Sequence, residues 1–412
     1  MNKVLIIGHN WPEPTTTAAG HRMVQLILAF LHFNWPVIFV SAASKTKYTI
    51  DLEELGVETN VVQLNHSSFD EFLKKESPTY VVFDRFMVEE QFGWHVAEHA
   101  PKAVRVLNTE DLHSIRKTRE RLHKKGEEFT IKKWLTEDIT KREIASIYRS
   151  DLSLIVSTFE MNMLQEHLQI PEKIMLYLPF MLEEVTETIQ TGWPTFKDRL
   201  DLITYGNGKH APNVDSILYL KNTLWPRIRK AFPDATLKVF GAYLPQQIHE
   251  IHAPKEGFHI VGWVKDLDIE IRKAKLVLAP LRFGAGIKGK ITDSLKNGTP
   301  MVTTQVGAEG MSLDVLPMQC VNSDSPDSLV DSIIKLYTNE ELWYNAQKLG
   351  FKIINDHYSK VGYEKKLRQV LEKLSKKISE HRNQNFIGSL LQHQTMTATK
   401  FMAKWIEEKN SR

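Results

Sequence analysis

The chain has 412 residues, of which 42% are hydrophobic and 25% are charged. A chain of this length predicts two domains of roughly 150–200 residues each, because one ordinary core does not grow so large. The net charge of +3 gives no reason to expect nucleic acid as a main partner. Cys320 is the only cysteine, which excludes an internal disulfide and a zinc site built from cysteines.

The N-terminal half alternates short apolar runs with helical patterns. The run VLIIG (4–8) is too short for a signal peptide and predicts a first β-strand, and an amphipathic helix is expected over 18–31. The apolar stretch 26–43 is interrupted by polar residues and by Pro36, so it predicts a helix, a turn and a strand and not a membrane span. Further strands are expected at residues 37–41, 81–84, 104–108 and 152–158. We therefore expect a cytoplasmic protein.

The same pattern restarts after the polar segment 186–201. Strands are expected at residues 202–207, 236–242, 258–263, 276–281 and 300–304. Continuous apolar strands that alternate with helices indicate parallel sheets covered on both faces. We therefore predict an α/β fold with two doubly wound, Rossmann-like domains, at 1–190 and 191–375, followed by a tail at 376–412. Ligands of such sheets bind beyond the carboxyl ends of the strands, which places the active site in the cleft between the domains.

A glycine-rich stretch, APLRFGAGIKGKITDSLKNGTPMVTT (279–304), ends one predicted strand and leads into an amphipathic helix. Its glycines allow the backbone to bend and to approach a ligand closely. Two lysines add positive charge where the helix begins. The residues concerned are Gly284, Gly286, Lys288, Gly289 and Lys290. This combination suits an anion, and several kinds of phosphate site share it.

Four interpretations of this stretch are open. The spacing fits the phosphate loop of nucleoside triphosphatases, but Ile291 stands where a hydroxyl should hold magnesium. The glycines also fit the dinucleotide fingerprint, although the following strand does not end in an acidic residue. A third ligand is a sugar-nucleotide diphosphate, held by backbone N–H groups at a helix N-terminus and neutralised by lysines. The fourth interpretation is a glycine-rich connection with solvated lysines.

Three stretches of the second half, in this order, resemble the donor-binding half of GT-B fold glycosyltransferases. They are NVDSILYLKNTLWPRIRKAFPDATLKVFG, VGWVKDL and APLRFGAGIKGKITDSLKNGTPMVTTQVGAEGM. More narrowly, they resemble family 4 of the glycosyltransferases, a large retaining group. The N-terminal GHNWPEPTTTAAGHRMVQL is similar to that family's first-strand loop. The resemblance covers residues 1–375 and implies a GT-B fold whose two parallel sheets face a central cleft.

The resemblance implies that the protein moves a sugar from a nucleotide-diphosphate sugar to an acceptor hydroxyl, with retention of anomeric configuration. The acceptor would be a glycan, a lipid-linked molecule or another hydroxyl compound. A sugar-nucleotide epimerase and a non-catalytic sugar-nucleotide binding module are the alternatives. They differ in product: an epimerase needs no acceptor, and a binding module does not turn the donor over.

The resemblance also implies which residues hold the donor phosphates. Gly20 would give close backbone approach to them. Gly286, Ile287 and Lys288 would wrap the diphosphate, and Lys288 would offset its charge. Lys209, in YGNGKHAPN, represents the basic residues that the family has after the first strand of its second domain.

The ribose and the base would be held by other residues of the second domain. Asp293 matches the second acid of the family's paired-glutamate pattern and would accept hydrogen bonds from the ribose hydroxyls. The first acid of the pair falls on Ala285, so its role toward the donor sugar is missing here or is filled otherwise. VGWVKDL matches the base-binding loop, in which Val264 would hold the base by backbone groups and Leu267 would pack nearby.

Titratable residues follow the strand predicted at 104–108. Glu110, Asp111 and His113 come directly after it, where a carboxylate can stabilise oxocarbenium-like charge or orient an acceptor hydroxyl. Glu110 is the first catalytic candidate, because related glycosyltransferases often carry a histidine in its place. Asp111 is expected to be a helix N-cap, and His113 is the reserve. Asp84 and Arg85, at another strand end, are acceptor-side candidates or a structural ion pair.

No metal or other cofactor is expected. Asp266 and Asp268 have the D-x-D spacing of a metal-nucleotide motif from a different glycosyltransferase fold. They stand where a helix begins, however, and acidic residues are common there because they complement the helix dipole.

Two segments bear on partners outside the cleft. Residues 116–149 carry eleven Lys/Arg against six Asp/Glu, which predicts a solvated helical face. The alternative is a docking surface for an anionic acceptor or for lipid headgroups, with the protein peripheral at the inner face of the membrane. Residues 385–409 have apolar positions at roughly helical spacing. As in other GT-B proteins, we expect this helix to cross back onto the first domain, with an oligomer contact and an interfacial anchor as alternatives.

Overall fold

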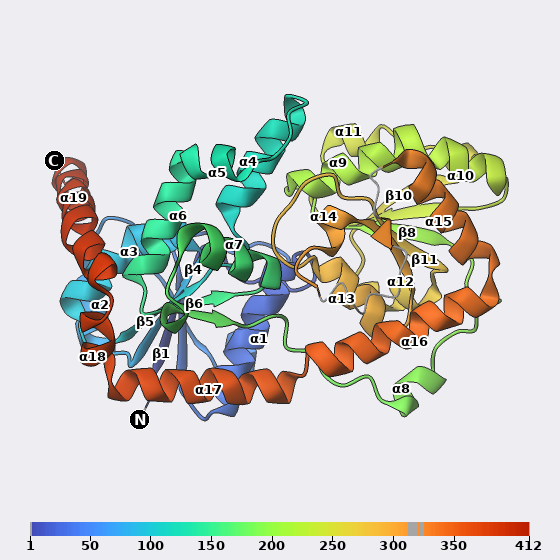
Figure 1. The fold of residues 1–412 in the computed structure, drawn as a ribbon. Helices are drawn as coiled ribbons and strands as arrows, with labels where there is room; N and C mark the ends of the chain where they lie inside the picture. Colours follow the sequence, from blue (N-terminus) through green and yellow to red (C-terminus); the bar gives the residue numbers. More distant parts are fainter. Residues whose placement is uncertain (1, 312–319, 322–324, 412) are drawn as a thin grey trace.

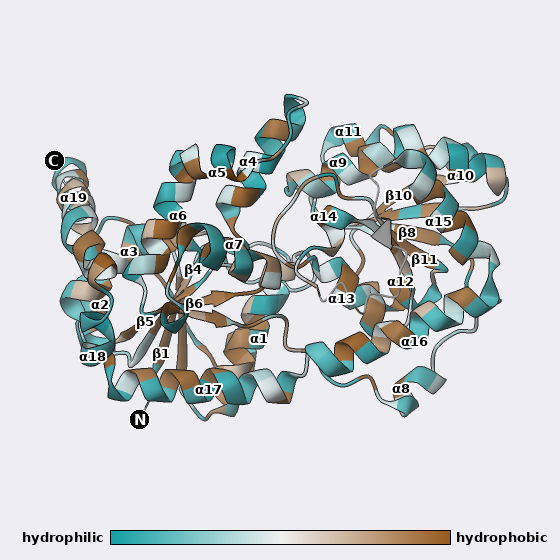
Figure 2. Cartoon of the chain, in the orientation of Figure 1, coloured by the Kyte–Doolittle hydropathy of each residue, from teal (hydrophilic) through white to brown (hydrophobic). Residues whose placement is uncertain are grey.

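The computed structural model describes residues 2–311, 320–321 and 325–411. Its described part contains two parallel β-sheets that lie side by side, each with helices on both faces (Figure 1). Hydrophobic residues are concentrated in the strands, and the outer sides of the helices are hydrophilic (Figure 2). The predicted α/β architecture with two doubly wound sheets is confirmed.

The first sheet has seven strands in the order β3-β2-β1-β4-β5-β6-β7. The strands are β1 (Val4–Gly8), β2 (Val37–Ser41), β3 (Glu58–Val61), β4 (Tyr80–Asp84), β5 (Val104–Asn108), β6 (Leu152–Ile155) and β7 (Met175–Tyr177). The helices between them are α1 (Ala18–His32), α2 (Ser68–Glu76), α3 (Phe86–His99), α4 (His113–Lys124), α5 (Ile131–Thr136), α6 (Asp138–Arg149) and α7 (Thr158–Leu168). Short 3₁₀ turns lie at Glu53–Leu55 and Glu172–Ile174.

The central strand β1 explains why this sheet is covered on both sides. Successive side chains of a strand point to opposite faces. Val4 and Ile6 are buried in one hydrophobic cluster, with residues of α1, and Leu5 and Ile7 are buried in another, with residues of α2 and α3. An apolar run of this kind is therefore hydrophobic at every position.

The edge strand β3 was not predicted. Its sequence, ETNV, has no buried residue, because one side of an edge strand and much of its surface face solvent. Prediction from apolar runs has no signal for such a strand. The short strand β7 was also missed.

The second sheet has six strands in the order β10-β9-β8-β11-β12-β13. They are β8 (Leu202–Tyr205), β9 (Leu237–Phe240), β10 (Phe258–Gly262), β11 (Leu276–Ala279), β12 (Met301–Thr304) and β13 (Cys320–Val321). The helices are α8 (Glu187–Thr191), α9 (Ala211–Tyr219), α10 (Trp225–Ala231), α11 (Gln246–His249), α12 (Leu267–Lys273), α13 (Gly289–Lys296), α14 (Gln305–Ala308), α15 (Pro326–Thr338) and α16 (Glu340–His357). A π-helical turn, Leu220–Leu224, joins α9 to α10, and a 3₁₀ turn lies at Pro254–Glu256.

The chain passes between the two sheets twice, and the two crossings lie side by side. The backbone N–H of Leu182, in the first crossing, donates to the carbonyl of Tyr358, in the second, at 2.8 Å. The N–H of Lys360 in turn donates to the carbonyl of Leu182 at 2.9 Å. The two domains are thus joined by a paired connection on one side of the cleft.

The return to the first domain begins earlier than the boundary that we expected at 375/376. Helix α17 (Lys360–Lys376) runs along the first domain, and its Leu367, Leu371 and Leu374 are buried in that domain's core (Figure 1). Leucines at this helical spacing form one apolar stripe, which the first sheet covers. The following helices are α18 (Ile378–Asn383) and α19 (Phe386–Asn410), and α19 packs against α3 and α6. The tail therefore crosses back onto the first domain.

Candidate active site

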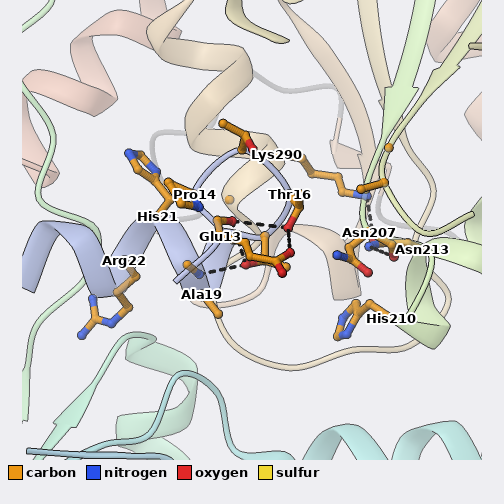
Figure 3. A pocket seen from close by; sticks show the side chains of 18 of the residues that line it. Glu13, Pro14, Thr16, Ala19, His21, Arg22, Asn207, His210, Asn213 and Lys290 are labelled. Carbon is orange, nitrogen blue, oxygen red and sulfur yellow. Dashed lines mark hydrogen bonds between the residues drawn. The ribbon is translucent and has the colours of Figure 1, made fainter. Parts of the chain in front are cut away.

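A cleft of about 980 Å³ lies between the two domains. It is lined by the loops that follow the carboxyl ends of strands in both sheets, as predicted for this architecture. In Figure 3, His21 and Arg22 lie on one side of the cleft, and Asn207, Asn213 and His210 lie on the other. All the site residues predicted from sequence line this cleft except Gly286.

The N-terminus of α1 enters the cleft at Gly20. The side chain of Thr17 caps this helix and accepts a hydrogen bond from the Gly20 N–H at 2.9 Å. A Cβ atom at Gly20 would lie only 2.6 Å from the carbonyl carbon of Glu13. Glycine is therefore required here to let the first-strand loop fold against the helix, whatever it does for a ligand.

Gly286 is placed differently from our expectation. Its φ of 65° lies in the left-handed region that favours glycine, and its N–H donates to the Oε1 atom of Glu160, in the first domain, at 2.8 Å. An added Cβ would lie 2.8 Å from the Cβ of Asp111. Gly286 thus allows close contact between the two domains. Its N–H group is directed to Glu160 and not into the cleft. Ile287 and Lys288 of the same loop do line the cleft.

Two buried lysines stand at the start of α13. The Lys288 Nζ donates to the Gly286 carbonyl at 2.9 Å, and the Lys290 Nζ donates to the Asn213 Oδ1 at 3.0 Å. Burial lowers the pKa of both ammonium groups to about 8. Within the described residues, no carboxylate forms an ion pair with Lys290. The sequence motifs gave Lys290 only a general positive charge, and its burial without an ion-pair partner among those residues was not predicted.

His210 is a further cleft residue that sequence motifs did not reveal. It precedes α9, and burial, reinforced by the charge of Arg116, lowers its pKa to about 3. The imidazole is therefore neutral at physiological pH and can donate or accept a hydrogen bond. A single histidine in a loop gives no sequence signal, because its burial and its neighbours depend on both domains.

The residues predicted to hold the nucleoside line the cleft from the second domain. Val264 and Leu267 are partly buried there, and Leu267 begins α12. The Lys209 Nζ lies 3.8 Å from the centre of the Tyr243 ring, a cation–π contact. The Asp293 carboxyl lies 3.4 Å from the Lys296 Nζ, and burial raises its pKa.

The D-x-D pair is explained by helix structure. Both residues stand where α12 begins, as predicted, and the Asp266 side chain caps this helix by accepting the Ile269 N–H at 3.2 Å. Asp268 accepts a hydrogen bond from Asn297 at 2.8 Å and lies 3.3 Å from the Lys296 Nζ. Across the described ranges, no group of three or more His, Cys, Asp or Glu residues is arranged to hold a metal ion.

Glu110 lines the cleft from the first domain, directly after β5. It has a φ of 63°, and its Oε1 accepts a hydrogen bond from the Asn108 side chain at 2.7 Å. The Asn108 side-chain Oδ1 in turn accepts a hydrogen bond from the Arg22 Nε at 3.1 Å. Burial, and next the charge of Asp84, raise the pKa of Glu110 to about 8. A carboxyl group poised in this way can change its protonation state near neutral pH.

Asp111 is not a helix cap, which corrects our expectation. The N-cap residue of α4 is Leu112, and the Asp111 carboxylate binds the Arg116 Nε at 2.6 Å and lies 2.9 Å from the His113 Nδ1. Although burial opposes ionisation, Arg116 and His113 hold the pKa of Asp111 well below its ordinary value. The first turn of α4 is capped from a distance, because Glu143 accepts the N–H groups of His113 and Ser114.

Asp84 and Arg85 lie beside Glu110 and form only a loose pair. The Asp84 Oδ2 accepts the His9 N–H at 3.1 Å, and its Oδ1 lies 3.9 Å from the Arg85 Nε. Among the described residues, neither that oxygen nor that nitrogen has a hydrogen-bond partner, although both atoms are buried. Arg85 also has a φ of 78°, which is strained for a residue other than glycine. Both groups are free to contact a ligand.

Comparison with known proteins agrees with this architecture. Residues 199–339 match the family model of the glycosyl transferases group 1. The structure is similar to sucrose-phosphate synthase from Thermosynechococcus elongatus (TM-score 0.68, 12% identity, 91% of this chain and 99% of that chain). It is also similar to HepE from Anabaena in complex with UDP and glucose (TM-score 0.64, 10% identity, 90% and 100%). A variant of S. aureus TarM in complex with Fondaparinux, alpha-GlcNAc-glycerol and UDP has a TM-score of 0.67 and 9% identity, with 90% and 100% covered.

The fold is the GT-B fold of glycosyltransferases, two Rossmann-like domains whose parallel sheets face a central cleft. More narrowly, the part of the chain that matches the glycosyl transferases group 1 lies in the second domain, where the motifs indicated this resemblance. No sequence among curated proteins matches the chain significantly. In the part of the chain that the structure describes, no helix is long and apolar enough to cross a membrane.

Proposed function

We propose that the protein transfers a sugar from a nucleotide-diphosphate sugar to a hydroxyl group of an acceptor. One observation carries this proposal: the ammonium group of Lys290 is buried in the cleft and has a neutral amide, that of Asn213, as its hydrogen-bond partner. A buried charge without a counter-charge is costly, so the site favours an anion. The N-terminus of α13 points to the same region and also favours negative charge.

The remaining predicted residues give the donor a direction. The base would lie against Val264 and Leu267, and the ribose hydroxyls would bind Asp293. The diphosphate would then reach Lys288, Lys290 and the loop N–H groups, with Lys209 nearby. This order leaves the sugar facing the first domain, where Glu110 lies. Because HepE and TarM were crystallised with UDP, a uridine diphosphate sugar is the first donor to test.

The chemistry follows from these positions. The bond between the anomeric carbon and the diphosphate oxygen breaks, and a bond from the acceptor oxygen to the same carbon forms. The lysines and the helix N-terminus stabilise the negative charge of the departing diphosphate, so no metal ion is needed for this purpose. The proton of the acceptor hydroxyl passes to the leaving diphosphate or to a carboxylate such as Glu110. Retention of anomeric configuration is supported by the family resemblance.

Calorimetry with UDP and with uridine tests the anion site. We expect Lys290→Ala to weaken UDP binding by roughly 1.5–3 kcal/mol, the value of a charge-assisted contact, and to leave uridine binding unchanged. Lys288→Ala should act in the same direction. Lys221→Ala is the control, because Lys221 pairs with Glu256 outside the cleft. An equal loss for both ligands would refute the phosphate assignment.

Turnover distinguishes the three functions. A panel of nucleotide sugars is incubated with and without candidate acceptors, and the products are identified by mass spectrometry. The proposed transferase forms a glycosylated acceptor, whose anomeric configuration is then read by NMR. An altered sugar nucleotide formed without acceptor would indicate an epimerase, and tight donor binding without any turnover would indicate a binding module.

A further inference from the structure

Glu160 lies in the first turn of α7, at the boundary between the two domains, and none of its surface is exposed. It is not part of any motif that pointed to the donor site. A fully buried carboxyl group needs a reason, because its desolvation is costly unless its oxygens are hydrogen-bonded.

One oxygen of Glu160 accepts hydrogen bonds from both domains. The Oε1 atom accepts the N–H of Leu112 at 2.8 Å and the N–H of Gly286 at 2.8 Å. Leu112 lies next to Asp111 in the loop 109–112, between β5 and α4, which we call the reaction-centre loop because it carries the catalytic candidate Glu110. Gly286 lies in the loop 280–288, between β11 and α13, which we call the donor loop. The Oε2 atom is buried and has no hydrogen-bond partner among the described residues.

The same turn of α7 holds a second loop of the opposite domain. The Thr158 hydroxyl donates to the Gly310 carbonyl at 3.2 Å. A Cβ at Gly310 would lie 2.0 Å from the Ser157 Oγ and 3.3 Å from the Ser157 Cα, so Gly310 packs closely against the residue that caps α7. The start of α7 is therefore a docking point for two loops of the second domain, and Glu160 supplies its hydrogen bond to the donor loop.

We propose that Glu160 is a positioning residue of the transfer reaction, because its Oε1 holds the donor loop at Gly286 and the reaction-centre loop at Leu112 on a single atom. The inference rests on the proposed function, and it identifies what holds the donor loop of the second domain against the reaction-centre loop of the first. Gly286 lies two residues from Lys288, so its position determines where the start of α13 presents its cations. The donor site is then complete only when the two domains are closed on α7.

Three variants of Glu160 test this role through donor affinity. Glu160→Gln keeps an oxygen acceptor at the same length, so UDP affinity should stay within about twofold of wild type. Glu160→Asp is one methylene shorter and Glu160→Ala has no acceptor, so both should weaken UDP binding about tenfold. Equal affinities for the Gln and Asp variants would overturn the proposal, and this comparison remains available if the Ala variant does not fold.

Glu143 supplies a matched control. It is 1% exposed and also accepts two N–H groups from the start of α4, those of His113 and Ser114 at 2.9 and 3.0 Å. Both of these bonds lie within the first domain. Glu143→Gln and Glu143→Ala should therefore lower the melting temperature by amounts comparable to the Glu160 variants and leave UDP affinity within about twofold of wild type. If the Glu143 variants weaken UDP as much as the Glu160 variants do, Glu160 is only a structural cap.

Hydrogen exchange separates this inference from the proposed function. In the free enzyme, the Gly286 amide should exchange about tenfold faster in Glu160→Asp than in wild type, and should be unchanged in Glu143→Ala. This readout needs neither donor nor acceptor. Failure of the wild-type protein to bind UDP, together with the expected exchange, would overturn the proposed function alone. UDP binding with unchanged Gly286 exchange would overturn the positioning role alone.

Discussion

The guanidinium of Arg119, in α4, forms two hydrogen bonds with the carboxylate of Glu309, in the second domain, at 2.5 and 2.8 Å. The same group donates to the Gly284 carbonyl at 2.9 Å and lies over the rings of Phe129 and Phe159. Bidentate pairs of this kind are strong and directional, and Arg119 is only 9% exposed. The pair with Glu309 joins the two domains, and the bond to Gly284 extends this contact to the loop that Glu160 also contacts, at Gly286.

We expect Arg119→Ala to favour an open arrangement of the domains, because it leaves Glu309 and the Gly284 carbonyl without their donor. The donor KM should rise about tenfold, and small-angle scattering should show a larger radius of gyration. Arg121→Ala is the control, because Arg121 lies in the same helix and pairs with Glu137 of its own domain. A wild-type KM and scattering profile in Arg119→Ala would show that the pair does not govern closure.

Glu110→Gln should lower the catalytic rate by at least roughly tenfold, about 1.4 kcal/mol of barrier, and leave donor affinity close to wild type. The carboxyl has a pKa raised to about 8 by burial and by Asp84, so it is protonated below this pH. If the carboxylate form acts, kcat/KM rises as the pH rises through about 8. The kcat/KM of the Gln variant should not show this rise. An unchanged rate, with His113→Ala also like wild type, would make the loop structural and direct attention to Asp84 and Arg85.

Lys290 should give UDP binding the opposite pH dependence. Its pKa is lowered to about 8 by burial, so the ammonium loses its charge as the pH rises through this value and UDP affinity should fall. In Lys290→Arg the charge at this position persists, so affinity should fall less between pH 7 and pH 9 than in wild type, and the decline that is left belongs to Lys288, whose pKa is also about 8. Calorimetry across this range measures the effect. The same decline in wild type and in the Arg variant would assign the titration to another group, with Lys288 the first to examine.

Activity should survive exhaustive chelation, because cations and a helix terminus already provide the positive field that a diphosphate needs. Asp266→Ala should cost about 1 kcal/mol of stability, the value of an N-cap, and leave turnover nearly intact. Asp268→Asn should also leave turnover nearly intact. Melting temperature and sugar transfer are measured together on each variant. A strict manganese or magnesium requirement, restored by titration, would contradict the assignment of the charge stabilisation to Lys288 and Lys290.

Much of the fold could be predicted from the chain alone. The strands at 4–8, 37–41 and 104–108 were predicted with the bounds that the structure has, because continuous apolar runs can be buried only in a sheet covered on both faces. Two sets of site residues could be found for a similar reason: the glycines and lysines at 284–290, and the acidic residues Glu110 and Asp111 after β5. Their chemistry lies in residues that are neighbours in sequence, and a strand end determines where they stand.

The partners of these residues could not be predicted in this way. Glu160 and Gly286 are 126 residues apart, and Arg119 and Glu309 are 190 residues apart, so their bonds arise only when the two domains close on each other. Closure also engages the Gly286 N–H, which the motif alone would have given to the phosphates. The burial of Lys290 and the raised pKa of Glu110 depend on the same distant packing, because desolvation is set by every element around a group and not by its neighbours in the chain.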